Sequence, residues 1–171
     1  LITQPIDPAG LALLEAANLM VEVWPGPEPM PETALLAQVK GCAGLISMLT
    51  DPVSAEVFDA GPLRVVAQHA VGINNIDLDA ARSRGIAVAH TPGVLTEATA
   101  DLTLALILGT ARRILESDQL VRSGQWVGWS PTLMRGLELH GSVLGIVGMG
   151  RIGAAVARRA EAFGMQVIHH N

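Results

Sequence analysis

Short apolar runs alternate with helix-forming stretches along the first ninety residues. The runs predict five strands, at residues 1–3, 20–23, 44–47, 63–68 and 86–89. Helices are predicted between them at 7–17, 31–39, 54–60 and 77–84, with Pro8 in a first turn, Ser54 as a cap and Gly85 as a stop signal. Strands that alternate with helices indicate a parallel sheet. We therefore expect an α/β fold.

The pattern changes after the loop at residues 90–93. One long helix is predicted over residues 96–122, with Gly124 beyond its end. Its first half is apolar nearly all round, so we expect it to be buried on several sides. Its second half carries charged residues and has a solvated face. Because this helix lies at the end of one domain and the start of another, we expect it to be an interdomain element.

A glycine fingerprint lies in the last part of the chain. The apolar residues 142–147 lead into Gly148-x-Gly150-x-x-Gly153, and a helix at 154–163, a stop at Gly164 and a strand at 165–169 follow. Such a fingerprint binds a dinucleotide: the first glycine allows the tight turn, the second lets the backbone approach the pyrophosphate, and the third lets helix and strand pack closely. A lone fingerprint is a weak signal, but its strand and helix flanks are those that the site needs. The alternative is a structural βαβ unit with a glycine-rich turn.

The ends of the chain also carry a prediction. The chain stops at Asn171, before the further strands of a doubly wound nucleotide fold, and it begins with Leu1 instead of Met. We expect a fragment that is open at both ends, with one domain at 1–95 and an incomplete second domain at 96–171.

Composition narrows the function class. Hydrophobic residues make up 50% and charged residues 16%, which is typical of parallel strands covered on both faces. No apolar run reaches the roughly 20 residues of a membrane span. The net charge of −5, with three Trp and two Phe, disfavours nucleic acid as a partner. The single Cys42 excludes an internal disulfide and a cysteine zinc site, and we expect a small buried hydrophobe there, with a reactive thiol as the alternative. These features predict a soluble cytoplasmic enzyme.

Several separate motifs, in order, carry a resemblance to a known family. They are Leu63-Arg-Val-Val-Ala-Gln-His-Ala-Val-Gly72, Asn75-Ile-Asp77, Thr91-Pro-Gly-Val-Leu-Thr-Glu-Ala-Thr-Ala-Asp101, Val121-Arg-Ser-Gly-Gln-Trp126 and Leu139-His-Gly-Ser to Gly153. The chain resembles the N-terminal half of a D-isomer-specific 2-hydroxyacid dehydrogenase, nearest the glyoxylate/hydroxypyruvate reductase branch. The resemblance implies a flavodoxin-like substrate domain at 1–95, followed by the interdomain helix and the start of a Rossmann NAD(P)-binding domain. It also implies a homodimer that reduces a small 2-keto acid.

The same resemblance assigns site residues. It implies that Val71 and Gly72 offer backbone N–H groups to the substrate carboxylate and that Leu49 lines the same cleft; glycine suits this because no Cβ blocks an anion. Val71 and Thr99 would contact the nicotinamide side of the cofactor. The remaining cofactor-binding residues would be Gly148, Met149, Gly150, Arg151, Ile152, Gly153 and Asn171. The alternatives are an ordinary turn at 70–73 and a Thr99 hydroxyl that bonds its own backbone. Asn74 departs from the family, where Asp is common, and this leaves the loop geometry open.

Asn171 bears on the choice of cofactor. NAD-preferring members of the family usually have Asp at this position, where its carboxylate binds the ribose 2′-OH and repels a 2′-phosphate. Asn is neutral and can donate to a phosphate, so we expect NADP, with NAD as the alternative. Asn171 could also be only a turn residue after a strand.

The catalytic residues implied by the resemblance, an Arg, a Glu and a His, would all follow Asn171. None of the histidines within the chain is therefore expected to be the general acid, and their spacing fits no metal site; they are His69, His90, His140, His169 and His170. We expect the 171-residue chain to be inactive by itself. The alternatives for the whole protein are a phosphoglycerate or formate dehydrogenase, or a nucleotide-binding regulator without turnover.

Overall fold

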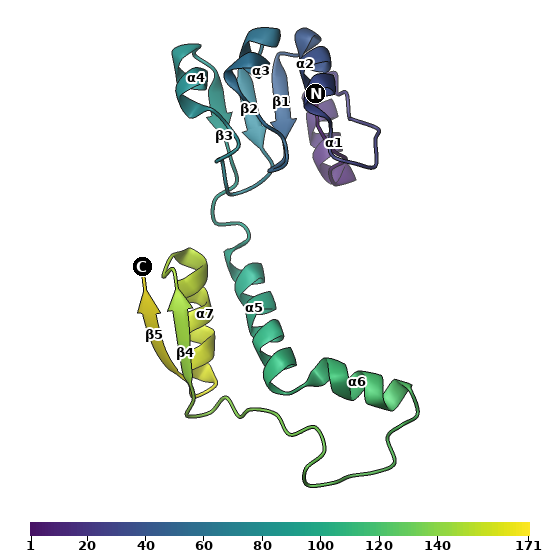
Figure 1. Ribbon diagram of the computed structural model, residues 1–171. Helices are drawn as coiled ribbons and strands as arrows, with labels where there is room; N and C mark the ends of the chain where they lie inside the picture. Colours follow the sequence, from purple (N-terminus) through teal and green to yellow (C-terminus); the bar gives the residue numbers. More distant parts are fainter. The chain divides into compact units, whose positions relative to one another are not determined.

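The computed structural model describes residues 1–171, which form two compact units, Leu1–Pro92 and Gly93–Asn171 (Figure 1). The predicted boundary between residues 95 and 96 lies slightly further along the chain.

The first unit is built on a parallel sheet. Strands β1 (Gly44–Ser47), β2 (Val65–Gln68) and β3 (Ala87–Ala89) lie in that order. Ile2 joins the sheet by single parallel bridges to Ile46 of β1 and to Val23. The five parallel segments therefore follow the chain order 2-1-3-4-5, which is the flavodoxin-like order. The predicted α/β class and flavodoxin-like fold are confirmed.

Two of the five predicted strands are wrong in detail. Residues 1–3 and 20–23 form only isolated bridges and no strand: Ile2 bridges to Val23 and to Ile46, and Val23 bridges to Ile2 alone. Backbone bonds still flank Ile2, whose N–H donates to Glu22 and whose carbonyl accepts from Trp24. Pro5 and Pro25 follow these segments closely, and proline has no N–H to continue a ladder. The pairing stops for that reason.

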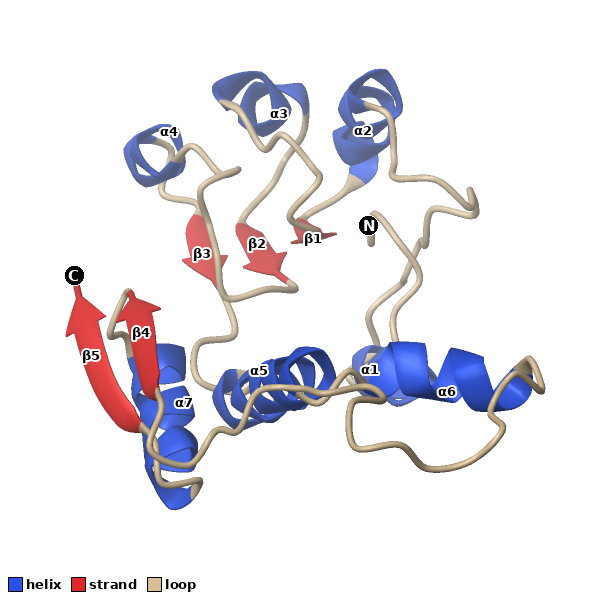
Figure 2. Ribbon diagram, turned by 60° about the horizontal axis from the view of Figure 1, so that its bottom comes forward, coloured by secondary structure: helices blue, strands red, loops and turns tan.

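Four helices surround this sheet. Helices α2 (Glu32–Gln38, continued by the 3₁₀ turn Val39–Gly41), α3 (Ala55–Ala60) and α4 (Leu78–Ser83) lie on one face, and α1 (Pro8–Ala16) lies on the other (Figure 2). The core between sheet and helices consists of apolar side chains such as Leu35, Leu45, Val57 and Val66. The side chains of Asp7 and Asp77 cap α1 and α4. Ser54 stands at the N-cap position of α3 as predicted, but its buried hydroxyl makes no capping hydrogen bond.

The second unit begins with two helices and not with one. The predicted helix over 96–122 is wrong: α5 (Thr96–Ala111) and α6 (Ile114–Arg122) are separated at Arg113, whose φ of 53° is left-handed. A left-handed residue cannot continue an α-helix, so the chain changes direction there. The expected burial of α5 on several sides is also wrong. Only Ala100 and Leu104 are buried, while Leu102 and Leu106 are 60% and 63% exposed.

The rest of the second unit is a βαβ motif. Strands β4 (Val143–Val147) and β5 (Gln166–His170) pair in parallel, and α7 (Arg151–Ala162) connects them. Helix α7 begins before the predicted residue 154, because the fingerprint residues themselves form its first turn. Its Ala155 and Val156 pack against Ala100 and Leu104 of α5 in a small core. None of the helices in the chain combines the length and apolar character that crossing a membrane requires.

Candidate substrate and nucleotide sites

The first candidate site lies in the loops that follow β1 and β2. Neighbouring parallel strands end at the same edge of a sheet, so their following loops meet there. Leu49 follows β1 and Gly72 follows β2, and the Leu49 Cδ2 atom lies 3.3 Å from the point that a Cβ on Gly72 would occupy. Leu49 and Val71 are 59% and 41% exposed. The structure thus brings the predicted residues Leu49 and Gly72 together, with open access from solvent.

A buried chain of hydrogen bonds lies beneath these loops. The Ser47 hydroxyl donates to Oε1 of Gln68 (2.6 Å), and Nε2 of Gln68 donates to Oδ1 of Asn75 (3.0 Å). The Asn75 amide nitrogen donates to the backbone carbonyls of Met48 and Asp51. Ser47 and Gln68 are almost fully buried. These side chains connect the end of β1, the end of β2 and both following loops.

Asp51 fixes the end of the loop after β1. Its side chain is buried, and Oδ2 accepts hydrogen bonds from the Thr3 hydroxyl (2.5 Å) and from the Met48 backbone N–H (2.6 Å). Its Oδ1 atom has no partner. The turn of residues 48–51 is therefore closed on itself by its own last side chain.

The loop after β2 is held from a second side. The Nδ1 atom of His90 lies 2.8 Å from the carbonyl oxygen of Val71, and the Thr91 N–H donates to the carbonyl of Ala70. His90 thus holds the backbone of the loop that carries Val71 and Gly72.

Sequence reasoning missed Asp51, Gln68, Asn75 and His90. Gln68 ends an otherwise apolar strand, and Asp51 and Asn75 follow strand ends in the same way. Polar residues at the carboxyl ends of parallel strands are a signal for a site, and this signal was available. The sequence could not show which of these side chains bond to one another, because this depends on the register of β1 and β2.

The second candidate site is the glycine loop between β4 and α7, where the three glycines differ. Gly148 has a φ of +94°, which side chains rarely adopt, and a Cβ on Gly153 would clash with the carbonyl oxygen of Gly148. A Cβ on Gly150 would meet nothing within 4 Å. The first and third glycines are therefore required by the fold of the chain, as expected for a tight turn and for close helix packing. The second glycine faces open space, which fits a backbone that a pyrophosphate approaches.

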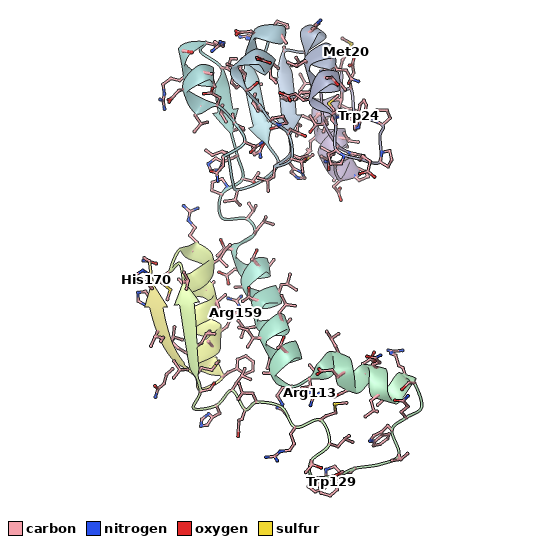
Figure 3. The ribbon with its side chains drawn as sticks, in the orientation of Figure 1. Met20, Trp24, Arg113, Trp129, Arg159 and His170 are labelled. Carbon is pink, nitrogen blue, oxygen red and sulfur yellow. The ribbon has the colours of Figure 1, made fainter.

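Asn171 lies across this loop. Its Oδ1 accepts the backbone N–H of Met149 (2.5 Å), while the N–H of Gly148 donates to the carbonyl of His170 at the end of β5 (Figure 3). The structure therefore brings Asn171 to Gly148-Met149-Gly150. The amide nitrogen of Asn171 stays free to donate, and the residue is exposed.

Thr99 is the remaining cofactor candidate in the second unit. It is half-buried on α5 and makes no hydrogen bond to the glycine loop; its carbonyl accepts from the Thr103 hydroxyl. Arg159 of α7 forms ion pairs with Glu97 (2.8 Å) and Asp101 (2.7 Å) of α5 (Figure 3). These ion pairs hold α5 against α7. The hydrogen bond that Arg159 donates to Glu97 is the main reason that the pKa of Arg159 is raised, and the one it donates to Asp101 adds to this effect. No group of three or more His, Cys, Asp or Glu side chains is arranged to hold a metal ion.

Comparison with known proteins decides the family. Residues 1–168 match the catalytic domain of the D-isomer specific 2-hydroxyacid dehydrogenases. The chain belongs to this family. It is 49% identical over 172 residues to a glyoxylate reductase of Korarchaeum cryptofilum, covering 99% of this chain and 52% of the relative.

Solved structures show the same family likeness. The TT0316 protein from Thermus thermophilus has a TM-score of 0.94 and 51% identity, covering 99% of this chain and 54% of that structure. A D-lactate dehydrogenase from Aquifex aeolicus, solved with NAD and lactic acid, has a TM-score of 0.79 and 25% identity, covering 99% of this chain and 50% of that one. The chain spans about half the length of the curated dehydrogenases that it matches.

Proposed function

We propose that the full-length protein is a reductase that converts a small 2-keto acid, glyoxylate or hydroxypyruvate, to the D-2-hydroxy acid with NAD(P)H. The observation that carries the proposal is the contact between Leu49 and Gly72 at the ends of β1 and β2, in a chain 49% identical to a glyoxylate reductase. The family membership supports a dehydrogenase chemistry.

In this proposal residues 1–95 form the substrate domain. The backbone N–H groups of Val71 and Gly72 bind the carboxylate, because successive N–H groups in a loop form an anion-binding concavity. Leu49 supplies an apolar wall that keeps water from one side of the bound keto acid. The hydrogen bond between His90 and the Val71 carbonyl supports a fixed orientation for this loop.

Residues 96–171 form the first part of the cofactor domain. The pyrophosphate would lie at the loop that runs from Gly148 through Met149, Gly150, Arg151 and Ile152 to Gly153, where the first N–H groups of α7 have no side-chain cap. The free space at Gly150 supports this placement. When bound, the reduced nicotinamide supplies the hydride. Contacts of Val71 and Thr99 with the nicotinamide stay predictions.

We infer that NADPH is the preferred cofactor. Asn171 accepts from Met149 through its oxygen, which leaves its neutral amide nitrogen as a donor beside the glycine loop. A 2′-phosphate would meet a donor there and no carboxylate. The family's Arg, Glu and His are expected after Asn171, where His would protonate the developing alkoxide and Arg would hold the carboxylate. A cytoplasmic homodimer remains part of the proposal for the full-length protein.

The proposal is tested with the purified full-length protein. It is assayed with glyoxylate, hydroxypyruvate, a phosphorylated hydroxypyruvate and formate, each with both cofactors. We expect turnover of glyoxylate or hydroxypyruvate. Turnover of only the phosphorylated acid or of formate would assign another branch of the family, and nucleotide binding without any turnover would assign a regulator.

The Gly72→Val variant tests the substrate site separately. The new Cβ would press on Leu49, whose Cδ2 atom lies 3.3 Å away, and the branched side chain would cover the anion-binding N–H groups. We expect KM for glyoxylate to rise by about tenfold or more, with cofactor affinity nearly intact. An unchanged KM would show that the loop at 71–72 is only a turn.

A further inference from the structure

One side chain from the loop after β2 holds both ends of the turn after β1. The Asn75 amide nitrogen donates to the carbonyl of Met48 at 3.0 Å and to the carbonyl of Asp51 at 2.8 Å. These two carbonyls enclose Leu49 and Thr50. The position of Leu49 is thereby fixed from the loop after β2, which also carries Val71 and Gly72.

The orientation of the Asn75 amide follows from its partners. Its Oδ1 accepts from Gln68, whose own Oε1 accepts from Ser47. Carbonyl oxygens only accept, so the nitrogen of Asn75 must face Met48 and Asp51, and its oxygen must face Gln68. A flipped Asn75 amide would place its oxygen against two carbonyl oxygens and its nitrogen against the amide nitrogen of Gln68. The hydrogen bonds therefore run in one direction from a buried hydroxyl to the exposed loop.

We propose that Asn75 is the positioning residue that sets the spacing between Leu49 and the N–H groups of Val71 and Gly72. This inference rests on the proposed function of those loops. The other hydrogen bonds of the turn around Leu49 do not reach the loop after β2: Asp51 closes the turn onto Met48 and Thr3, and the Gln4 amide donates to the Thr50 hydroxyl at 3.4 Å. The Leu49 side chain lies beside Gly72 without a hydrogen bond. Without the two bonds from Asn75 the turn can move away from the loop after β2. The anion-binding groups and the apolar wall are then no longer held at one separation, and the carboxylate is bound less tightly.

The test uses Asn75→Asp and Asn75→Ala in the full-length protein. Asp has almost the shape of Asn, but at neutral pH it places carboxylate oxygens against two carbonyls, whereas Ala removes all three hydrogen bonds. We expect KM for glyoxylate to rise by about tenfold or more in both variants. The turnover number should change much less, and NADPH affinity, followed by fluorescence titration, should stay within about twofold.

Asp77→Ala is the matched control. Asp77 lies two residues further along and caps α4, where its side chain accepts a hydrogen bond from the Ala80 N–H and not from residues 48–51 or 71–73. Its loss should lower the melting temperature, as the loss of Asn75 should, but leave KM at the wild-type value. If the Asn75 variants lower only the melting temperature and keep a wild-type KM, the residue is merely structural and the proposal is overturned.

Hydrogen exchange separates this inference from the proposed function. In Asn75→Asp the amides of residues 48–51 and 71–73 should exchange at least about tenfold faster than in wild type and in Asp77→Ala. Absence of keto acid turnover in the wild-type protein would refute the proposed function, but the exchange rates of the three proteins would still test whether Asn75 holds the two loops. Equal exchange rates in all three proteins would refute the positioning role. If Asn75→Ala does not fold, the near-isosteric Asp variant decides both measurements.

Discussion

At the scale of single residues, the three fingerprint glycines are required for different reasons. Gly148 has a left-handed backbone and Gly153 packs against a carbonyl, whereas Gly150 has free space around it. Gly148 and Gly153 are therefore needed for the fold of the loop, whereas Gly150 determines how closely a ligand can approach the backbone.

Substitution of the middle glycine should therefore separate binding from folding. In Gly150→Val the fold should survive with a nearly unchanged melting temperature, while Kd for the cofactor rises by about tenfold or more, because a branched side chain occupies the pyrophosphate position. Fluorescence titration and thermal unfolding measure the two effects. Gly41→Val, also in open space but in the first unit, serves as the control and should bind cofactor normally. Normal binding by Gly150→Val would make the fingerprint a packing turn.

Asn171 should govern the preference between the two cofactors. Asn171→Asp places a negative charge beside the glycine loop, where it repels a 2′-phosphate and accepts from a ribose hydroxyl. We expect the ratio of kcat/KM for NADPH to that for NADH to fall by about tenfold or more. The wild-type protein should use NADPH at least as well as NADH. A strong NADH preference in the wild type would remove the role given to Asn171.

Sequence alone predicted which residue types stand at these sites, but not which atoms meet. Leu49 and Gly72 are far apart in the chain, and their contact follows from the adjacency of β1 and β2. The bond between Asn171 and Met149 likewise needs β5 to lie beside β4. Such contacts become visible only once strand order and register are known.

At the scale of elements, the pattern of apolar positions predicted most helices and strands, and it failed where backbone geometry overrides composition. Residues 96–122 contain no proline and a single glycine, Gly109, yet the chain breaks at Arg113 with a left-handed φ. The short segments around Ile2 and Val23 have strand composition, but the prolines that follow leave each of them with isolated bridges and no strand. A breaker that is neither Gly nor Pro has no local signal.

Helices α3 and α4 are joined by an ion pair that should respond to pH. Arg84 donates two hydrogen bonds to Asp59. These bonds are the main cause that lowers the pKa of Asp59. A carboxyl group whose pKa is lower in the folded state stabilises the fold above its ordinary pKa of about 3.9 and loses this effect as the pH falls through the lowered value.

Asp59→Asn should therefore have a lower melting temperature than wild type at pH 7, and the two curves should converge as the pH falls through the lowered pKa of Asp59 and the wild-type carboxyl becomes protonated. Thermal unfolding across this range measures the difference. The exposed Glu56→Gln on the same helix should show no comparable difference. Parallel curves for wild type and Asp59→Asn down to pH 2 would contradict a role for the pair.

At the scale of the whole molecule, the two units differ in how completely their sheets are built. The first has three strands and two bridged segments, with a core between sheet and helices. The second has two strands, and Val143, Val147 and Ile168 are 56%, 91% and 62% exposed. Two paired strands without further neighbours are marginally stable in water.

The 171-residue chain should accordingly be protected unevenly. Amide hydrogens of β4 and β5 should exchange at least about tenfold faster than those of β1 and β2, since local opening exposes them more often. Hydrogen exchange followed by mass spectrometry resolves these segments. The polypeptide 1–92, made alone, should unfold cooperatively, and equal protection of both sheets in the longer chain would contradict the comparison.

The free space at Gly150 has a consequence for descent. Selection for folding keeps glycine at positions 148 and 153 in any lineage that retains β4 and α7, whether or not a cofactor is bound. Position 150 is kept as glycine only while something outside the chain requires it. In a descendant that has abandoned the cofactor, this position drifts first, and its two neighbours persist as a relic of the former site.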